Sequence, residues 1–330
     1  MVIKTSRRQF IAAGVAATTL PGFGRRAFAQ SGWPSKPIRM VVGYPAGGQT
    51  DMIARAYSDF LSKQLGQPVL VDNKAGAGGI VGAVEVKRAA PDGYTLMCSI
   101  LTTLVLNRGT VKNLPYDPEN DFTMFSLVLG AGLPLVVSQK TGVTNLQEFV
   151  EYARKADKVN VGTYAAGSLA HMYISELNKQ FGLKLEPVHY RGEAPMWADL
   201  IGQSLDAAIG SYNAALPALQ SGRAKAIGVA GPTRIQPMSG LPTLKEQGVT
   251  SRLFELVSFT GFGTPAGTSM EIVKKLSELM VAGGKDPNVQ RALAGLSLEP
   301  ALNFEATQKI FKEESPLWLR YMKDLGIEPQ

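Results

Sequence analysis

Short apolar runs alternate with segments of helical periodicity along most of the chain. The run at residues 38–42 reads as a buried strand. From Met52 to Leu65, apolar side chains then recur at the spacing of one helix face. The same order of strand, glycine-containing turn and helix returns at residues 69–90 and 159–171. This repeated β-α order predicts an α/β fold in which most strands are parallel.

Further strands are predicted where short apolar runs are bounded by turn residues. They are residues 69–71, 94–98, 159–161, 185–190, 205–209, 224–230 and 254–262. The sequence from Thr144 to Gln147 resembles a capping box that opens a helix over residues 146–156. Near the C-terminus, Ser315 and Pro316 are expected to cap and begin a new helix, because proline is favoured at the first helical position.

Two apolar runs interrupted by glycine, residues 127–134 and 257–265, have the character of crossings between domains. If both connect the same two lobes, the two ends of the chain build one lobe and the middle builds the other. That arrangement suits hinge closure over a ligand. The pattern alone leaves the pairing of the two crossings open.

The first 29 residues read as an export signal. They contain the twin arginine Arg7-Arg8, a short apolar stretch at residues 11–20, and the small-x-small pattern of residues 27–29. A membrane anchor is the alternative, but a span needs ~20 apolar residues and this stretch has about half of them. We therefore expect a twin-arginine signal peptide over residues 1–29.

Composition and charge indicate a well-packed globular protein. Hydrophobic residues make up 45% of the chain and charged residues 18%. The formal charge of +7 includes five basic residues of the leader, which has no acid, so the chain from Gln30 onward carries about +2. It has no basic block with interleaved aromatic residues, and we expect no nucleic-acid partner. The single cysteine, Cys98, is expected to be a buried small hydrophobe.

The stretch GYPAGGQTD, residues 43–51, joins the first predicted strand to the first helix. The first amides of a helix lack internal partners and carry partial positive charge, so an anion fits beside them. An acid at position 51 would discourage a phosphate, which favours a carboxylate; a tight turn without a ligand is the alternative. The candidate ligand-binding residues here are Tyr44, Ala46, Gly47, Gly48, Thr50 and Asp51.

A second turn of this kind lies at residues 161–171, where hydroxyl side chains accompany the glycines. Ser168 is a plausible N-cap. His171 in the first helical turn is expected to be neutral, because the helix dipole disfavours a positive charge there. The alternative for this histidine is a capping or interlobe role. The candidate residues are Thr163, Tyr164, Gly167, Ser168 and His171.

Weaker candidates come from three other positions. Gly78 belongs to a second glycine-rich turn, and Ser99 ends the strand that contains Cys98. Arg191 follows a predicted strand, where it can pair with a second ligand carboxylate or form a surface salt bridge.

Motifs of cofactor-dependent and catalytic chemistry are missing from the sequence. It has no Walker sequence, no complete G-x-G-x-x-G, no G-x-S-x-G elbow, no H-E-x-x-H and no Cys/His cluster of metal spacing. We therefore expect no cofactor, no metal site and no enzymatic activity. The enzymatic alternative is a periplasmic hydrolase that uses Ser168 and His171, although no third, orienting acid is evident.

Several linked stretches resemble the TctC/Bug-type solute-binding proteins of tripartite tricarboxylate transporters. The resemblance runs from about Trp33 to the C-terminus. The stretches are WPSKPI at 33–38, YPAGGQTD at 44–51, VDNKAGAGG at 71–79, APDGYTL at 90–96, VHYRGEAP at 188–195 and LPTLKEQG at 241–248.

The resemblance implies a type II periplasmic-binding-protein-like fold: two α/β lobes, a hinge and an interlobe ligand cleft. Lobe 1 would comprise residues 30–130 and 255–330, and lobe 2 residues 131–254. It implies a monomeric periplasmic receptor for a small organic carboxylate, which it delivers to a two-component membrane permease. A receptor that feeds a sensor kinase is an alternative that the sequence does not separate.

At position 164 the chain departs from the family pattern. The family usually has a small or hydroxyl residue where this chain has Tyr164. The ring can narrow the pocket or stack on an aromatic acid, which places an aromatic carboxylate beside di- and tricarboxylates as a candidate ligand. A ring packed on its own lobe is the alternative.

Overall fold

The computed structural model describes residues 32–130 and 132–329. The predicted signal peptide, residues 1–29, lies outside these residues. The chain from Trp33 onward forms one compact unit. Within the described part of the chain, every helix is too short or too polar to cross a membrane.

The first of two five-stranded sheets has the strand order β2-β1-β3-β10-β4. Its strands are β1 (Ile38–Val42), β2 (Val69–Asn73), β3 (Thr95–Ile100), β4 (Phe122–Gly130) and β10 (Ser258–Pro265). Strand β1 lies between β2 and β3 and runs parallel to both, with Met40 in register with Val71 and Leu96. Strand β10 runs antiparallel to both β3 and β4.

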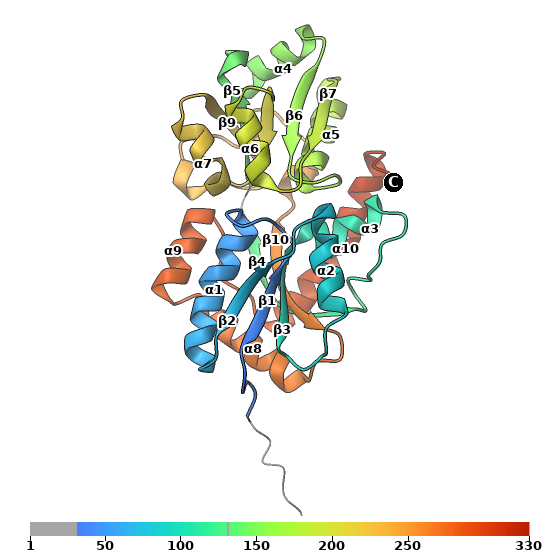
Figure 1. Cartoon of the computed structure of the whole chain (residues 1–330). Coiled ribbons are helices and arrows are strands. Elements are labelled where there is room, and N and C mark those ends of the chain that lie inside the picture. The colour runs from blue at the N-terminus through green and yellow to red at the C-terminus, as the bar shows by residue number, and fades with distance from the viewer. Residues whose placement is uncertain (1–31, 131, 330) are drawn as a thin grey trace, which may run out of the picture. The chain divides into compact units, whose positions relative to one another are not determined.

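Helices cover both faces of this sheet (Figure 1). They are α1 (Gln49–Leu65), α2 (Ile80–Lys87), α3 (Asn107–Thr110), α8 (Met270–Gly283), α9 (Pro287–Leu296) and α10 (Phe304–Asp324). Short helical segments lie at η1 (Ala77–Gly79) and η2 (Thr102–Leu106). Met40 and Val42 pack into the cluster that contains Tyr57 of α1, whereas Val41 packs on the opposite face with Trp318 of α10. Burial on both faces explains why β1 reads as an uninterrupted apolar run.

The second sheet has the order β7-β6-β8-β5-β9. Its strands are β5 (Leu133–Ser138), β6 (Val159–Thr163), β7 (Leu185–His189), β8 (Ala207–Ile209) and β9 (Ala224–Ala230). Its helices are α4 (Leu146–Lys155), α5 (Leu169–Phe181), α6 (Glu193–Ile201) and α7 (Tyr212–Gln220). Met196 and Trp197 of α6 pack with Ala215 of α7 against one face of this sheet. Short 3₁₀ segments lie at η3 (Gln139–Thr141), η4 (Gln236–Met238) and η5 (Arg252–Glu255).

Most strands pair in parallel, as expected: β1 with β2 and β3 in the first sheet, and β6 with β7 and β8 in the second. Both sheets are nevertheless mixed, because each also contains one strand that runs the opposite way, β10 and β5 respectively. The chain leaves the first sheet after Gly130 and enters the second at Leu133; it leaves β9 at Ala230 and returns at Ser258. Each crossing leaves one sheet at the carboxyl ends of its parallel strands. It enters the other sheet at the carboxyl ends of that sheet's parallel strands. The entering strands β5 and β10 must therefore run opposite to the parallel strands.

The prediction of a helix start at Ser315 is wrong, because α10 runs without a break from Phe304 to Asp324. The Ser315 hydroxyl donates a hydrogen bond to the Phe311 carbonyl inside the helix. Phe311 and Trp318, on either side of Pro316, are both buried. Packing on both sides of the proline outweighs the backbone hydrogen bond that it removes.

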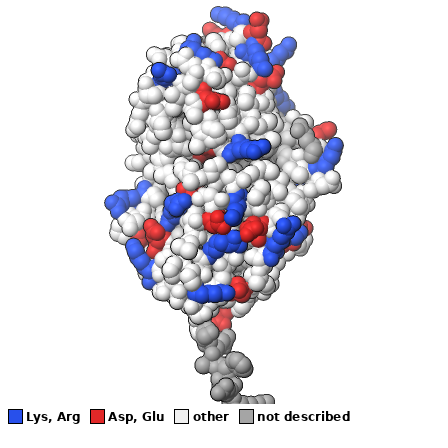
Figure 2. All heavy atoms as spheres, in the orientation of Figure 1, with Lys and Arg blue, Asp and Glu red and all other residues white. Residues whose placement is uncertain are grey.

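Basic and acidic side chains are intermixed on the face shown in Figure 2. Several basic and acidic side chains of the described residues form ion pairs; Arg39, for example, contacts both Asp72 and Glu85. Such partly exposed pairs contribute little to stability. The core therefore supplies most of the stability of the fold.

Candidate functional site

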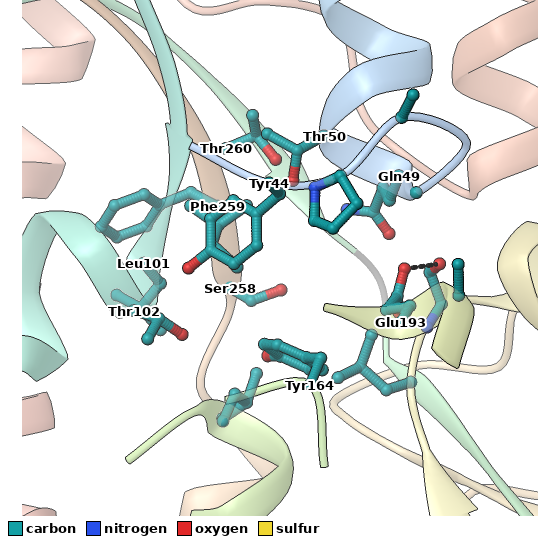
Figure 3. Close-up of a pocket in the computed structure, with 18 residues that line it drawn as sticks. Tyr44, Gln49, Thr50, Leu101, Thr102, Tyr164, Glu193, Ser258, Phe259 and Thr260 are labelled. Atoms are coloured by element: carbon teal, nitrogen blue, oxygen red, sulfur yellow. Dashed lines mark hydrogen bonds between the residues drawn. The ribbon is translucent and has the colours of Figure 1, made fainter. Parts of the chain in front are cut away.

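A pocket of about 660 Å³, part of it open to solvent, is lined by residues of both sheets and their following loops (Figure 3). It lies at the carboxyl ends of the parallel strands, where open α/β sheets generally bind ligands. The lining residues are Tyr44, Pro45, Ala46, Gly48, Gln49, Thr50, Ile100, Leu101, Thr102, Leu133, Tyr164, Leu169, Glu193, Ala194, Ser211, Ser258, Phe259 and Thr260.

The loop between β1 and α1 brings the start of α1 to this pocket. Gly47 has a φ of 85°, which favours glycine, and Gly48 is the extended N-cap of α1. Because glycine has no side chain with which to cap the helix, the first amides of α1 are left for other partners. Gly48, Gln49 and Thr50 all line the pocket.

Asp51 lies behind this loop and outside the pocket lining. Its carboxylate accepts hydrogen bonds from the Gly47 amide at 3.0 Å and from the Asn73 side chain at 3.0 Å, and it pairs with Arg55. Burial opposes its ionisation, but Arg55, the Gly47 amide and Asn73 together hold the pKa of Asp51 below its ordinary value. Asp51 therefore stabilises the conformation of this loop without lining the pocket.

Tyr44 lines the pocket and is fixed by its hydroxyl group. This hydroxyl donates to the Gly78 carbonyl at 3.1 Å and lies 3.1 Å from the Thr103 hydroxyl. The Gly78 carbonyl also accepts from Thr103 and Asn107. Burial raises the pKa of Tyr44 well above its ordinary value, so the phenol stays protonated. Gly78 thus positions a pocket residue and does not itself line the pocket.

In the loop after β6, Tyr164 lines the pocket, whereas Thr163 and Ser168 do not. The Thr163 hydroxyl donates to the Ala165 carbonyl at 3.1 Å and lies 2.8 Å from Nδ1 of His189. Ser168 is the N-cap of α5, and its hydroxyl accepts from the His171 amide at 3.3 Å. Thr163 and Ser168 therefore organise the loop. Burial raises the pKa of Tyr164 well above its ordinary value.

His171 lies in the first turn of α5, outside the lining residues. Its Nδ1 accepts a hydrogen bond from the Gly167 amide at 3.1 Å, and its ring centroid lies 4.7 Å from that of His189. Burial, with a smaller effect from His189, lowers the pKa of His171 to about 4. The imidazole is therefore neutral near pH 7.

Ser99 and Arg191 lie apart from the pocket lining. Ser99 is buried in β3 opposite Gly261 of β10. Arg191 is exposed and lines a smaller neighbouring pocket together with Gly78, Tyr44 and Tyr164. Of the predicted residues, those at the main pocket are Tyr44, Ala46, Gly48, Thr50 and Tyr164.

Several polar lining residues were not predicted from the sequence. They are Gln49, Thr102, Glu193, Ser211, Ser258 and Thr260. The Thr102 and Thr260 side chains are buried, and the Thr102 hydroxyl lies close enough to the Tyr44 and Tyr164 phenols to oppose the rise of their pKa values. Ser258 and Thr260 belong to the apolar run at 257–265 that the sequence marks as a crossing between domains. This is the one sequence feature that could have indicated that they lie at the pocket.

Glu193 is the charged member of the described lining residues, among which none is Lys, Arg or His. Its carboxylate accepts hydrogen bonds from the amide of Ser211 and, at 2.7 Å, from the Ser211 hydroxyl. Burial raises the pKa of Glu193, while Ser211 and the Gln49 amide act in the opposite direction. Over the described residues, no cluster of three or more His, Cys, Asp or Glu side chains is placed to hold a metal ion.

Comparisons with known proteins agree with this architecture. The model of the tripartite tricarboxylate transporter family receptor, TctC, matches residues 53–327. A UPF0065 protein in the gbd 5' region of Cupriavidus necator is 33% identical, with 89% of this chain and 90% of that protein covered.

Two solved structures show that the similarity to known proteins includes the fold. R. palustris Rpa4515 with adipate is 30% identical, with a TM-score of 0.85, and covers 90% of this chain and 100% of its own. The periplasmic binding protein BugD is 31% identical, with a TM-score of 0.84, and covers the same shares of the two chains. These structures confirm the expected fold of two α/β lobes. The chain belongs to the TctC family of tripartite tricarboxylate transporter receptors, the TctC/Bug-type periplasmic solute-binding proteins.

Proposed function

We propose that this protein captures an organic carboxylate in the pocket between its two lobes and delivers it to the two-component membrane permease of a tripartite tricarboxylate transporter. The observation that carries the proposal is the meeting, in one pocket, of the start of helix α1 with the hydroxyl-bearing residues Thr102 and Thr260. A carboxylate supplies acceptors for both kinds of donor.

Recognition would come from neutral donors. Tyr44 and Tyr164 both line the pocket, and their phenols stay protonated because burial raises the pKa of each. Tyr44 donates its proton to the Gly78 carbonyl, so the donors left for the ligand include the Tyr164 phenol and the α1 amides. Hydrogen bonds from neutral groups to a carboxylate are strengthened by its charge, and the apolar walls reduce competition from water. The adipate in the related R. palustris structure supports a carboxylate as the ligand class.

The lobes that close on the ligand are residues 30–130 and 255–330 on one side and 131–254 on the other. The two crossings, between Gly130 and Leu133 and between Ala230 and Ser258, would provide the hinge. A monomer exported through the twin-arginine signal at residues 1–29 completes the proposal. The chemistry requires no cofactor.

The geometry does not favour a hydrolase that uses Ser168 and His171. The Ser168 hydroxyl accepts a hydrogen bond from the backbone amide of His171, and Nδ1 of the imidazole accepts one from Gly167. Both side chains therefore serve the start of α5, and neither lines the pocket. An activated serine needs its proton in contact with a base.

A thermal-shift screen of the purified protein tests the proposal. The panel comprises aliphatic mono-, di- and tricarboxylates, amino acids and aromatic acids, each with its amide as an uncharged control. Ligand binding to the folded state raises Tm by mass action. We expect a shift with one class of acids and none with the corresponding amides. A cooperative melt that no acid shifts, in protein free of retained ligand, would contradict the carboxylate assignment.

A further inference from the structure

Glu193 places a carboxylate at one side of a pocket that is otherwise lined by apolar, hydroxyl and amide groups. Burial raises its pKa, and hydrogen bonds from Ser211 and the Gln49 amide favour the ionised form against this effect. Glu193 lies in the first turn of α6 and faces Gln49 at the start of α1 (Figure 3). Within the described part of the chain, no Lys, Arg or His lines the pocket to balance this charge.

The carboxylate of Glu193 is held by Ser211 and lies against the start of α1. The Ser211 hydroxyl donates to it at 2.7 Å, and the Ser211 amide donates to the other carboxylate oxygen. From α1, a Cβ built on Gly48 would lie 3.6 Å from Oε2 of Glu193, so the carboxylate lies against the start of this helix. The protein's own acid therefore occupies part of the region where α1 amides would attract an anion.

This arrangement has opposite consequences for two kinds of ligand. A second ligand carboxylate near Glu193 would face a like charge in a site with little water. A protonated amine there would instead donate charge-assisted hydrogen bonds to Glu193. A ligand with one ammonium and one carboxylate adds no net charge to the pocket, whereas a dicarboxylate adds two negative charges.

We propose that Glu193 makes the pocket selective for an amino carboxylate with an apolar body. The ammonium group lies against Glu193, and the carboxylate lies against the Thr102 and Thr260 hydroxyls and the start of α1 at Thr50. Leu101, Leu133, Leu169, Ile100 and Phe259 surround the apolar body. This assignment rests on the proposed function as a carboxylate receptor and narrows its ligand class.

Calorimetric titration of the full chain with matched ligands tests the selectivity. Hexanoate, 6-aminohexanoate and adipate share a carbon chain and differ at one end; 4-methylpentanoate and leucine form a second pair with the amine beside the carboxylate. We expect the better amino ligand to bind at least about tenfold more tightly than its amine-free partner, and adipate to bind least.

Two variants connect this preference to position 193. Glu193→Gln keeps the size and an acceptor but removes the charge, and should lower affinity for the amino ligand about tenfold while raising affinity for adipate. Asp199→Asn, the same change on an exposed residue of the same helix, should alter neither affinity. Far-UV circular dichroism verifies folding; if Glu193→Gln does not fold, the ligand ranking of the unmodified chain decides.

The outcomes separate this inference from the proposed function. Tight binding of adipate or hexanoate without a preference for the amine, or an unchanged ranking in Glu193→Gln, overturns the role of Glu193 and leaves a carboxylate receptor standing. If none of these ligands binds and the wider acid screen also fails, the proposed function is overturned as well.

Discussion

The hydroxyl of Tyr44 donates a hydrogen bond to the carbonyl oxygen of Gly78 at 3.1 Å. This contact ties the loop between β1 and α1 to the glycine-rich turn before α2, so that a residue outside the pocket fixes the orientation of a ring that lines it. This hydrogen bond thus holds the two glycine-rich turns together.

Tyr44→Phe should therefore affect both folding and binding. Loss of this buried hydrogen bond should lower the free energy of unfolding by about 1 kcal/mol, and a less firmly oriented Tyr44 ring should weaken ligand binding. Urea denaturation and calorimetry measure the two effects. Tyr116→Phe is the control, because its hydroxyl donates to the Thr103 carbonyl at 2.6 Å and does not line the pocket. Equal loss of affinity in both variants would argue against a direct role for Tyr44.

Alanine should mainly reduce stability at Gly47 and mainly reduce ligand affinity at Gly48. Gly47 has a φ of 85° and its Cβ would meet no atom within 4 Å, so Gly47→Ala should cost about 1 kcal/mol of stability and leave binding largely intact. Gly48 has a φ of −81°, which alanine tolerates, but its methyl group would lie at the pocket near Glu193. Gly48→Ala should mainly reduce affinity. Urea denaturation and ligand titration measure these effects; a reversed pattern would show that Gly47 and not Gly48 borders the ligand.

Asp51→Asn should reduce stability in a pH-dependent manner. The folded-state pKa of Asp51 is lowered, so its contribution is fully present above its ordinary pKa of 3.8 and is lost as the pH falls through the lower folded-state value. The difference between the two proteins should be about 2 kcal/mol near pH 7 and should shrink in acid. Urea denaturation at several pH values measures this difference. A difference that does not depend on pH would show that the charge of Asp51 is irrelevant to folding.

His171 should make the fold sensitive to mild acid. Its pKa of about 4 in the folded state lies below the ordinary value of 6.5, so the unfolded chain binds the proton first and stability falls between these two values. The loss should be on the order of 2–3 kcal/mol. In His171→Gln this part of the pH dependence should disappear, as measured by urea denaturation from pH 7 to 4. The burial-lowered pKa of His189 contributes in the same direction, and His189→Gln separates the two.

The candidate site was predictable where it depends on local chain order. The loop after β1 was found because a strand, a glycine pair and a helix start are adjacent in the sequence, and Tyr44, Gly48 and Thr50 do line the pocket. The loop after β6 was found in the same way, but Thr163 and Ser168 use their hydroxyls within that loop. Whether a hydroxyl points into a pocket or to its own backbone depends on packing that local sequence does not encode.

By itself, the sequence determined the alternation of strands and helices, the start of a helix at Leu146, the cap of another at Ser168, and the family of the protein. These features depend on burial periodicity and capping over a few neighbouring residues. Only the tertiary structure decided that β5 and β10 run antiparallel, and that Glu193 meets Ser211 and the start of α1. Those contacts join distant segments, and their formation depends on how the sheets and helices pack together.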